Sequence, residues 1–211
     1  MAFTINTGDA VSALTTFRLT VKADHAALGT LQERYHGETP GSRRLVTDLV
    51  QRVGFQILVA VRIMRLVRDL HVPFGPQIVS RLIRHLYAAE VHWNAELAPG
   101  MALVHGNGLV ISHGAAVGPG CIVFQGVTLG ESIDPVTRQV GAPTIGRNVH
   151  IGPNSVLLGP ISVGDGTKIM ANVTLVESVP AGCVVRSSAP VIIERQLFDS
   201  PPHSPSARFP K

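Results

Sequence analysis

The sequence predicts a parallel β-solenoid that follows a small helical lobe. From Leu97 to Pro180 the chain repeats in frames of six residues, each opening with an aliphatic residue, as in IGRNVH, IGPNSV and VGDGTK. This period is typical of a parallel β-helix, in which one frame supplies a short strand and a turn and three frames close a triangular coil. The alternation of apolar and polar residues that an antiparallel β-sandwich requires is absent. The segment before the repeat carries apolar residues at helical spacing instead.

Two segments of the lobe, residues 10–36 and 43–71, have the apolar spacing of amphipathic helices. The sequence HGETPGS between them is expected to be a loop. The apolar stripe of the second helix consists of Leu45, Leu49, Val53, Ile57, Val61 and Met64.

A third helix is expected from Phe74 or Pro76 to Tyr87, directly before the first coil. The second helix also carries a row of arginines that has the pattern of a basic stripe facing a membrane. We expect this row on a solvated or intersubunit face instead. The arginines are Arg62, Arg65 and Arg68.

The first residue of each frame is expected to point inward, because stacked coils enclose a narrow column that Leu, Ile and Val fill well. A two-residue slip of the frame follows LVHGNG, and a longer interruption lies between Gly130 and Ile145. There the sequence ESIDPVTRQVGAPT adds about ten residues to one coil. A loop over 131–144 should therefore project from the solenoid, and such loops often carry functional sites.

We therefore expect a helical lobe over residues 1–89, a β-helix domain over 90–195, and a flexible Pro- and Ser-rich tail over 196–211. A chain of 211 residues is long enough for one well-buried core and a smaller lobe. The formal charge of +4 is spread along the chain, so nucleic-acid binding is not expected.

The cysteines and the N-terminus indicate where the protein works. Cys121 and Cys183 lie far apart in the sequence and are most simply core or surface thiols in a reducing compartment. The N-terminus lacks a basic segment followed by an apolar one, and no apolar run reaches transmembrane length. We expect a cytoplasmic protein with no membrane partner.

Four segments resemble the serine acetyltransferase family of hexapeptide-repeat acyltransferases. They are GFQILVAVRI (54–63), EVHWNAELAPGMALVHGNGLVI (90–111), VFQGVTLGE (123–131) and GAPTIGRNVHIGPNSVLLGPISVGDGTKI (141–169). The resemblance implies a left-handed coil, which departs from the usual right-handed crossover. It also implies acyl transfer from an acyl-CoA, most simply acetyl-CoA, to a hydroxyl of serine or a related small acceptor.

The resemblance places the catalytic histidine of the family at His105. An imidazole near neutral pKa can remove the hydroxyl proton as attack on a thioester occurs. Glu90 stands where the family has the Asp that orients this histidine and stabilises its imidazolium. Without the resemblance, His105 reads as a solvent-exposed turn histidine.

The residues that the resemblance assigns to the acceptor differ from the family pattern. The family Asp that grips the amino group of serine is replaced by Val104, and an Arg-His pair is replaced by Gly141 and Ala142. Arg138 is a substitute partner for a carboxylate, and Glu38 is a loose match to an N-terminal acidic group. Losing two charged anchors puts serine itself in question.

Coenzyme A binding in the family uses backbone amides and small residues along the edge of the coil. Gly152, Ser155 and Ala171 match that groove, and Arg186 and Arg195 are candidates for the phosphates. The family also forms trimers with sites between neighbouring prisms, so we expect a homotrimer. The chain does not end in the C-terminal Ile that docks family members into the next enzyme of cysteine synthesis, so that complex is not expected.

Three alternatives stay open from the sequence. The acceptor is a sugar or an amine-bearing metabolite in one of them, and in another the chain is an inactive trimeric scaffold that has lost its acceptor site. The third is a zinc hydrolyase of the same fold, which needs three imidazoles around an open position. Because no His-x4-His pair of that branch occurs, we expect no metal. The available histidines are His92, His105, His113 and His150.

Overall fold

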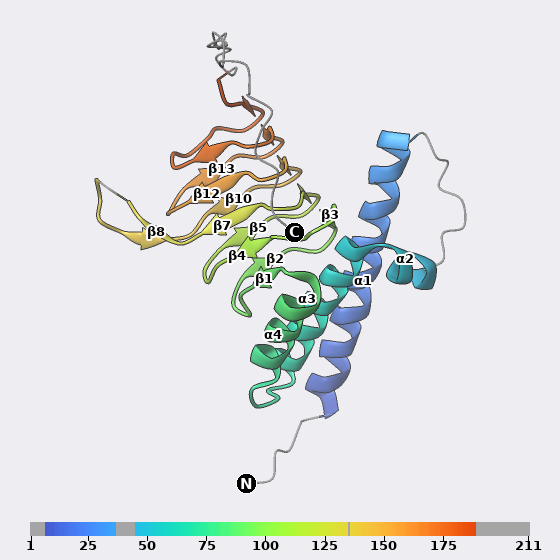
Figure 1. The fold of residues 1–211 in the computed structure, drawn as a ribbon. Coiled ribbons are helices and arrows are strands. Elements are labelled where there is room, and N and C mark those ends of the chain that lie inside the picture. Colours follow the sequence, from blue (N-terminus) through green and yellow to red (C-terminus); the bar gives the residue numbers. More distant parts are fainter. Residues whose placement is uncertain (1–6, 37–44, 135, 189–211) are drawn as a thin grey trace, which may run out of the picture.

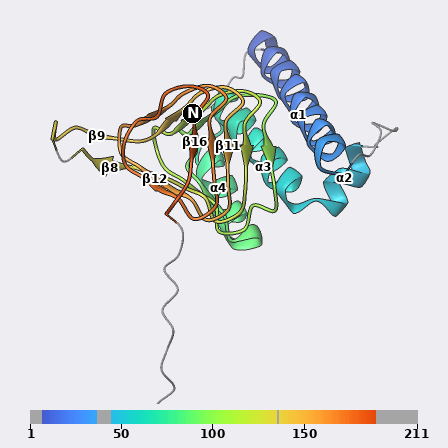
Figure 2. The same ribbon diagram turned by 90° about the horizontal axis from the view of Figure 1, so that it is seen from above.

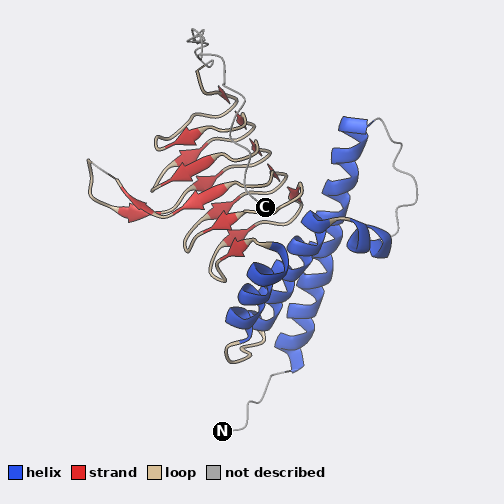
Figure 3. Cartoon of the chain, viewed as in Figure 1, coloured by secondary structure: helices blue, strands red, loops and turns tan. Residues whose placement is uncertain are grey.

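The computed structural model describes residues 7–36, 45–134 and 136–188 of the chain. Helices make up its N-terminal part and short parallel strands the remainder, as Figures 1 and 3 show. The described helices are α1 (Thr7–His36), α2 (Leu45–Gln51), α3 (Val53–Asp69) and α4 (Gly75–Tyr87).

Three parallel sheets form the faces of a triangular solenoid, named here faces A, B and C. Face A has the spatial order β1 (Glu90–Val91), β4 (Val110–Ile111), β7 (Thr128–Gly130), β12 (Val156–Leu158) and β15 (Thr174–Leu175). Face B has the order β13 (Ser162–Val163), β10 (Thr144–Ile145), β5 (Ala116–Val117) and β2 (Glu96–Leu97). Face C has the order β16 (Val184–Val185), β14 (Lys168–Ile169), β11 (His150–Ile151), β6 (Ile122–Val123) and β3 (Ala102–Leu103).

The pairing register measures the length of each coil. Glu90 pairs with Val110, twenty residues later, whereas Val110 pairs with Thr128, eighteen residues later. Thr128 then pairs with Val156, twenty-eight residues later. Since three frames of six make eighteen residues, the first coil contains two extra residues and the third contains ten. Both interruptions expected from the repeat are therefore confirmed.

Aliphatic side chains from all three faces fill the interior of the solenoid. In most strands one residue points inward and is buried while its neighbour is more exposed, as the pleat of a strand requires. The fully buried members include Ile111, Val123, Leu129, Ile151, Leu157 and Ile169.

The two extra residues of the first coil lie between β3 and β4, on the edge where face C passes into face A. We call this the C–A edge. The ten extra residues lie between β7 and β10, on the A–B edge, and form an antiparallel hairpin of β8 (Ser132–Ile133) and β9 (Val140–Gly141). Figures 1 and 2 show this hairpin projecting away from the helices.

The second helical segment differs from the single helix expected over 43–71. It is divided at Arg52, whose extended backbone (φ −120°, ψ 103°) ends α2 and begins α3. Within α3, Ile57, Val61 and Met64 are buried against the first coil, as their spacing predicted. The expected loop HGETPGS lies almost entirely outside the described residues.

The expectation that Arg62 faces solvent or another subunit is wrong. Its side chain is only 3% exposed and pairs with Asp24 of α1, which is 1% exposed, at 2.8 Å from Nε to Oδ2. The guanidinium also donates to the carbonyl oxygens of Leu97 and Ala98, and Asp24 accepts from the Gly100 backbone N–H. Because a buried charge needs full pairing, this cluster fixes α1 and α3 on the solenoid.

None of the described helices is long and apolar enough to cross a membrane.

Candidate active site

His105 occupies the widened corner of the first coil. It follows β3 and adopts a left-handed backbone with φ +64°, and Gly106 and Gly108 after it have φ +92° and +71°. Regular corners of the solenoid place a single Gly or Asn in this conformation, such as Gly120 and Asn154. A non-glycine residue here is strained, and such strain gathers at functional sites. The two extra residues thus lift His105 out of the regular coil.

Helix α3 packs directly on this corner through Gly54. A Cβ on Gly54 would lie 1.9 Å from the backbone oxygen of Leu103, so only glycine permits this approach. A Cβ on Gly106 would in turn lie 2.6 Å from Cδ1 of Ile57 in the same helix. The corner that carries His105 is therefore held by the start of α3.

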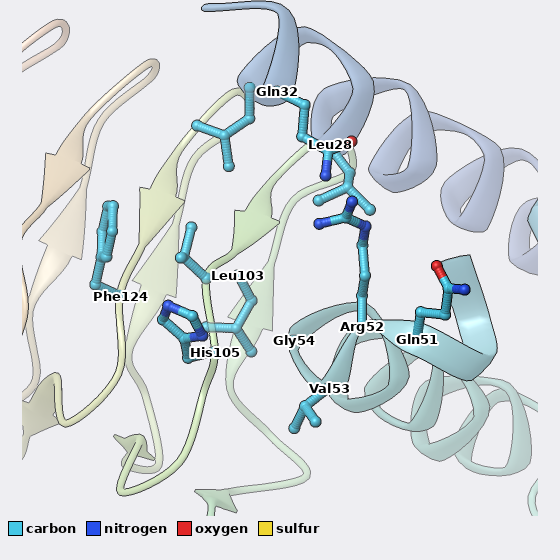
Figure 4. A pocket seen from close by; sticks show the side chains of 11 residues that line it. Leu28, Gln32, Gln51, Arg52, Val53, Gly54, Leu103, His105 and Phe124 are labelled. Atoms are coloured by element: carbon cyan, nitrogen blue, oxygen red, sulfur yellow. The ribbon is translucent and has the colours of Figure 1, made fainter. Parts of the chain in front are cut away.

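A cavity of about 460 Å³ opens between α1, the start of α3 and the His105 corner. A volume of this size is typical of pockets for small organic ligands. Figure 4 shows His105 beside Phe124 on the solenoid side of the cavity and Gln32, Leu28 and Arg52 on the helical side. The lining residues are Leu28, Leu31, Gln32, Gln51, Arg52, Val53, Gly54, Leu103, Val104, His105 and Phe124.

Arg52 supplies the guanidinium of this cavity. Its Nε donates to Oδ1 of Asp48 at 3.0 Å, and Asp48 also lies 2.8 Å from Nε2 of His25. Within the described part of the chain no hydrogen bond uses the two terminal nitrogens of Arg52. Gln32, on the opposite wall, is 5% exposed, and its Oε1 has no hydrogen-bond partner among the described residues.

The structure does not join Glu90 to His105 by a hydrogen bond. Glu90 lies at the start of face A, with an exposed side chain that pairs with the guanidinium of Arg84 in α4. The corner that carries His105 nevertheless stacks on the residues just before Glu90, because the Gly108 N–H donates to the Ala88 carbonyl oxygen at 2.8 Å.

The acceptor residues expected from the sequence fall on two edges. Val104 lines the cavity beside His105 on the C–A edge, but Ala142 and Arg138 belong to the A–B edge. Arg138 is exposed near the tip of the β8–β9 hairpin, with φ +60°. Ala142 packs on the solenoid core. Within one subunit these two residues therefore do not belong to the His105 cavity, and Glu38 lies outside the described residues.

Four of the expected coenzyme A residues share the C–A edge with His105. Gly152 stacks on Ala171, because a Cβ on Gly152 would lie 2.6 Å from the Ala171 nitrogen. Ser155 is fully buried and donates its hydroxyl to the Met170 carbonyl oxygen at 2.9 Å, which leaves it a structural role. Arg186 is exposed just after β16. Arg195 lies outside the described residues.

The remaining histidines lie on other parts of the surface. The rings of His92 and His113 meet at 5.0 Å on the A–B edge, and His92 stacks on Trp93 at 4.0 Å. Burial and the neighbouring His113 lower the pKa of His92, while Glu131 and Glu90 oppose this shift. Among the described residues no group of three or more His, Cys, Asp and Glu side chains is placed to hold a metal ion.

Sequence reasoning missed three residues of the cavity. Phe124 opens a regular corner and reads as an ordinary frame residue, while Arg52 and Gln32 come from helices 20 residues apart in the sequence. The break of the helix at Arg52 was the only local signal, and the apolar stripe that runs through it concealed that signal.

The comparisons with known proteins agree with this arrangement. The chain matches the bacterial transferase hexapeptide (six repeats) family over residues 142–176. It is 35% identical over 148 residues to the serine acetyltransferase of Synechococcus elongatus, which covers 69% of this chain but only 59% of that protein. It is 30% identical over 150 residues to the serine acetyltransferase of Helicobacter pylori strain 26695, which covers 71% of this chain.

Solved structures give the same result. The crystal structure of Neisseria gonorrhoeae serine acetyltransferase in complex with serine superposes with a TM-score of 0.70 at 27% identity, over 85% of this chain and 70% of that one. The helical lobe, the coil lengths and the His105 corner thus lie in a chain whose likeness also extends over 86% of the Helicobacter pylori protein. This chain belongs to the serine acetyltransferase family.

Proposed function

We propose that this chain is an acetyl-CoA-dependent O-acetyltransferase that acts on the hydroxyl of serine or a related small acceptor. The observation that carries the proposal is the position of His105, in a cavity on the same edge as the candidate coenzyme A residues. Family membership supports it, and the name of the Neisseria gonorrhoeae relative states that it binds serine. A sugar or an amine-bearing metabolite is the alternative acceptor.

In the proposed reaction His105 acts as a general base. The acceptor hydroxyl attacks the thioester carbonyl carbon while the imidazole takes the hydroxyl proton. The tetrahedral intermediate then collapses, the C–S bond breaks, and the imidazolium returns the proton to the sulfur of coenzyme A. The described lining of the cavity contains neither serine nor cysteine, which favours direct transfer over a covalent acyl-enzyme.

Glu90 is proposed as a positioning residue for His105. A carboxylate there would orient the imidazole and stabilise its protonated form. To do so it must exchange its present contact with Arg84, an exposed pair that costs little to break.

The proposed assembly is a homotrimer of left-handed solenoids, in which residues 1–89 form a lobe and residues 90–195 form the catalytic domain. The β8–β9 hairpin exposes three apolar side chains, Ile133, Val136 and Val140, and Val136 is 87% exposed. Such a hairpin has apolar surface to offer a neighbouring subunit. It would bring Arg138 toward a neighbour's His105, while Arg186 and Arg195 bind coenzyme A phosphates.

Replacing His105 with Ala tests the mechanism. We expect turnover, measured as release of free coenzyme A thiol from acetyl-CoA, to fall by about two to four orders of magnitude. His85→Ala, on the exposed side of α4, is the matched control and should leave turnover unchanged. A His105→Ala protein that retains its thermal stability and full turnover would exclude His105 as the base.

The competing proposal is an inactive scaffold that has lost its acceptor site. An enzyme should bind acetyl-CoA and gain thermal stability in proportion to the logarithm of its concentration. Absence of this stabilisation, together with no thiol release for L-serine, homoserine, other hydroxylated or amino acceptors and nucleotide sugars, would support the scaffold.

A further inference from the structure

The cavity that holds His105 also contains an unassigned binding site for an anion. We propose that Arg52, Gln32 and the first turn of α3 bind a carboxylate of the acceptor, and that this enzyme therefore prefers hydroxy acids with an apolar body to serine. The inference rests on the proposed transferase function and names its substrate class.

Arg52 is prepared for this contact by its neighbours. Asp48 holds its Nε at 3.0 Å, which leaves the two terminal nitrogens available to a ligand. A planar guanidinium with two free nitrogens matches a carboxylate in bidentate geometry. Figure 4 shows Arg52 extending from the start of α3 toward Gln32 and Leu28 of α1.

The start of α3 adds a second attraction for an anion. Arg52 is its N-cap residue, no side chain caps it, and Val53 and Gly54 of its first turn line the cavity. The N–H groups of a first turn have no partner inside the helix, and the helix dipole places partial positive charge there.

Gln32 provides the independent observation that a ligand is missing. Its side chain is 5% exposed and lines the cavity, and its Oε1 has no partner among the described residues. Buried polar atoms are almost always hydrogen-bonded, so an unpartnered one at a cavity wall indicates a group that arrives with the ligand. An acceptor that carries a hydrogen-bond donor near its carboxylate satisfies this amide.

The rest of the lining selects the body of the acceptor. No carboxylate lines the described cavity, so the ammonium group of serine would have no counter-ion there. Val104, Leu31 and Phe124 offer apolar surface instead, and about 460 Å³ is room for an acceptor with a hydrocarbon body.

The test compares 3-hydroxyoctanoate with its neutral amide, 3-hydroxyoctanamide, by calorimetric binding and by coenzyme A release from acetyl-CoA. The wild-type protein should bind the acid at least 10-fold more tightly than the amide. Arg52→Gln should remove this preference and leave binding of the amide unchanged, which also shows that the variant is folded. Arg52→Lys should restore part of it, and Gln32→Leu should weaken binding of the acid several-fold. Arg81→Gln, exposed on α4, is the matched control.

Equal affinity for the acid and the amide, or an equal loss of both in Arg52→Gln, would overturn the inference. Its failure is distinguishable from failure of the transferase proposal. Arg52-dependent binding of the acid without any coenzyme A release would overturn the transferase proposal and support the anion site. Coenzyme A release at equal efficiency from the acid and the amide would do the reverse.

A gain-of-function variant tests the same site in the opposite direction. Val104→Asp places a carboxylate beside His105, where an ammonium group lacks a partner in the wild-type protein. L-serine turnover should then rise 10- to 100-fold, and turnover of 3-hydroxyoctanoate should fall. Efficient L-serine turnover by the wild-type protein with no gain in Val104→Asp would contradict the proposed preference.

Discussion

Two insertions break the six-residue repeat, and they lie on different edges of the solenoid. The two-residue insertion at His105 is covered by α3 and lines a cavity within the subunit. The ten-residue insertion forms the β8–β9 hairpin, which projects away from the helices with its apolar side chains exposed (Figure 2). A short insertion remains part of the packed fold, whereas a long one leaves it, so the first depends on its own subunit and the second on a neighbour.

Removing the hairpin is expected to give the largest effect. Replacing residues 132–141 with a short Gly-Ser linker should lower turnover by about 100-fold, because misplacing a positioning element by about 1 Å has effects of this size. The melting temperature of the subunit should change little, since the hairpin strands pair only with each other in the described structure. Coenzyme A release and differential scanning calorimetry measure the two quantities.

Two other outcomes would blur the contrast between the insertions. Full turnover in the variant without the hairpin would show that the long insertion is not part of the site. A large fall in melting temperature would show that it belongs to the packed fold after all.

Gly54→Ala tests the packing under the short insertion. The new Cβ would lie 1.9 Å from the Leu103 oxygen, so α3 must shift, and the free energy of unfolding should fall by about 1–3 kcal/mol. Gly29→Ala is the control, because a Cβ there meets nothing within 4 Å and alanine favours the helix by about 0.5–1 kcal/mol. Urea denaturation that shows the same stability change for both variants would mean that α3 does not rest on the corner as described.

Cys121 tests whether the coils remain closed across the long insertion. Its thiol is fully buried and donates to the Gly146 carbonyl oxygen at 3.1 Å, which joins the coil before the hairpin to the coil after it. Burial raises the pKa of Cys121 to about 11. A thiol reagent at pH 8 should therefore modify only Cys183 in the native protein, and Cys183→Ser should abolish native labelling.

The same shift predicts a small dependence of stability on pH. The folded-state pKa of Cys121 lies above the ordinary value of 9.0, so the contribution to stability is complete below pH 9 and is lost as the pH rises toward 11. Rapid labelling of Cys121 at pH 8 in the native protein would show that the two coils separate at the insertion.

The sequence predicted the solenoid and both insertions because a six-residue period is a local property. The lengths of the two interruptions could be counted directly from the frames, and the pairing of Glu90 with Val110 and of Thr128 with Val156 agrees with those counts. The buried ends of α3 were also predictable from helical spacing, as Ile57 and Met64 show.

The contacts between the lobe and the solenoid were not predictable in this way. Arg62 lies on a helix face that reads as polar, and only its meeting with Asp24, 38 residues earlier, makes burial affordable. Arg52 and Gln32 reach the His105 cavity through equally distant contacts. The position of His105 was predicted by the family resemblance, whereas its present partners depend on tertiary packing.

The cluster of Asp24 and Arg62 also sets the direction in which the solenoid is able to loosen. It ties the first coil to the helices through the backbone of Leu97, Ala98 and Gly100, so that end of the prism carries a terminal cap of the kind repeat proteins need. Among the described residues the opposite end has no such cover, and Val184 in the last strand is 65% exposed. Fraying should therefore start near Val184 and die out toward the capped coils, which keeps the His105 corner in the most protected part of the prism.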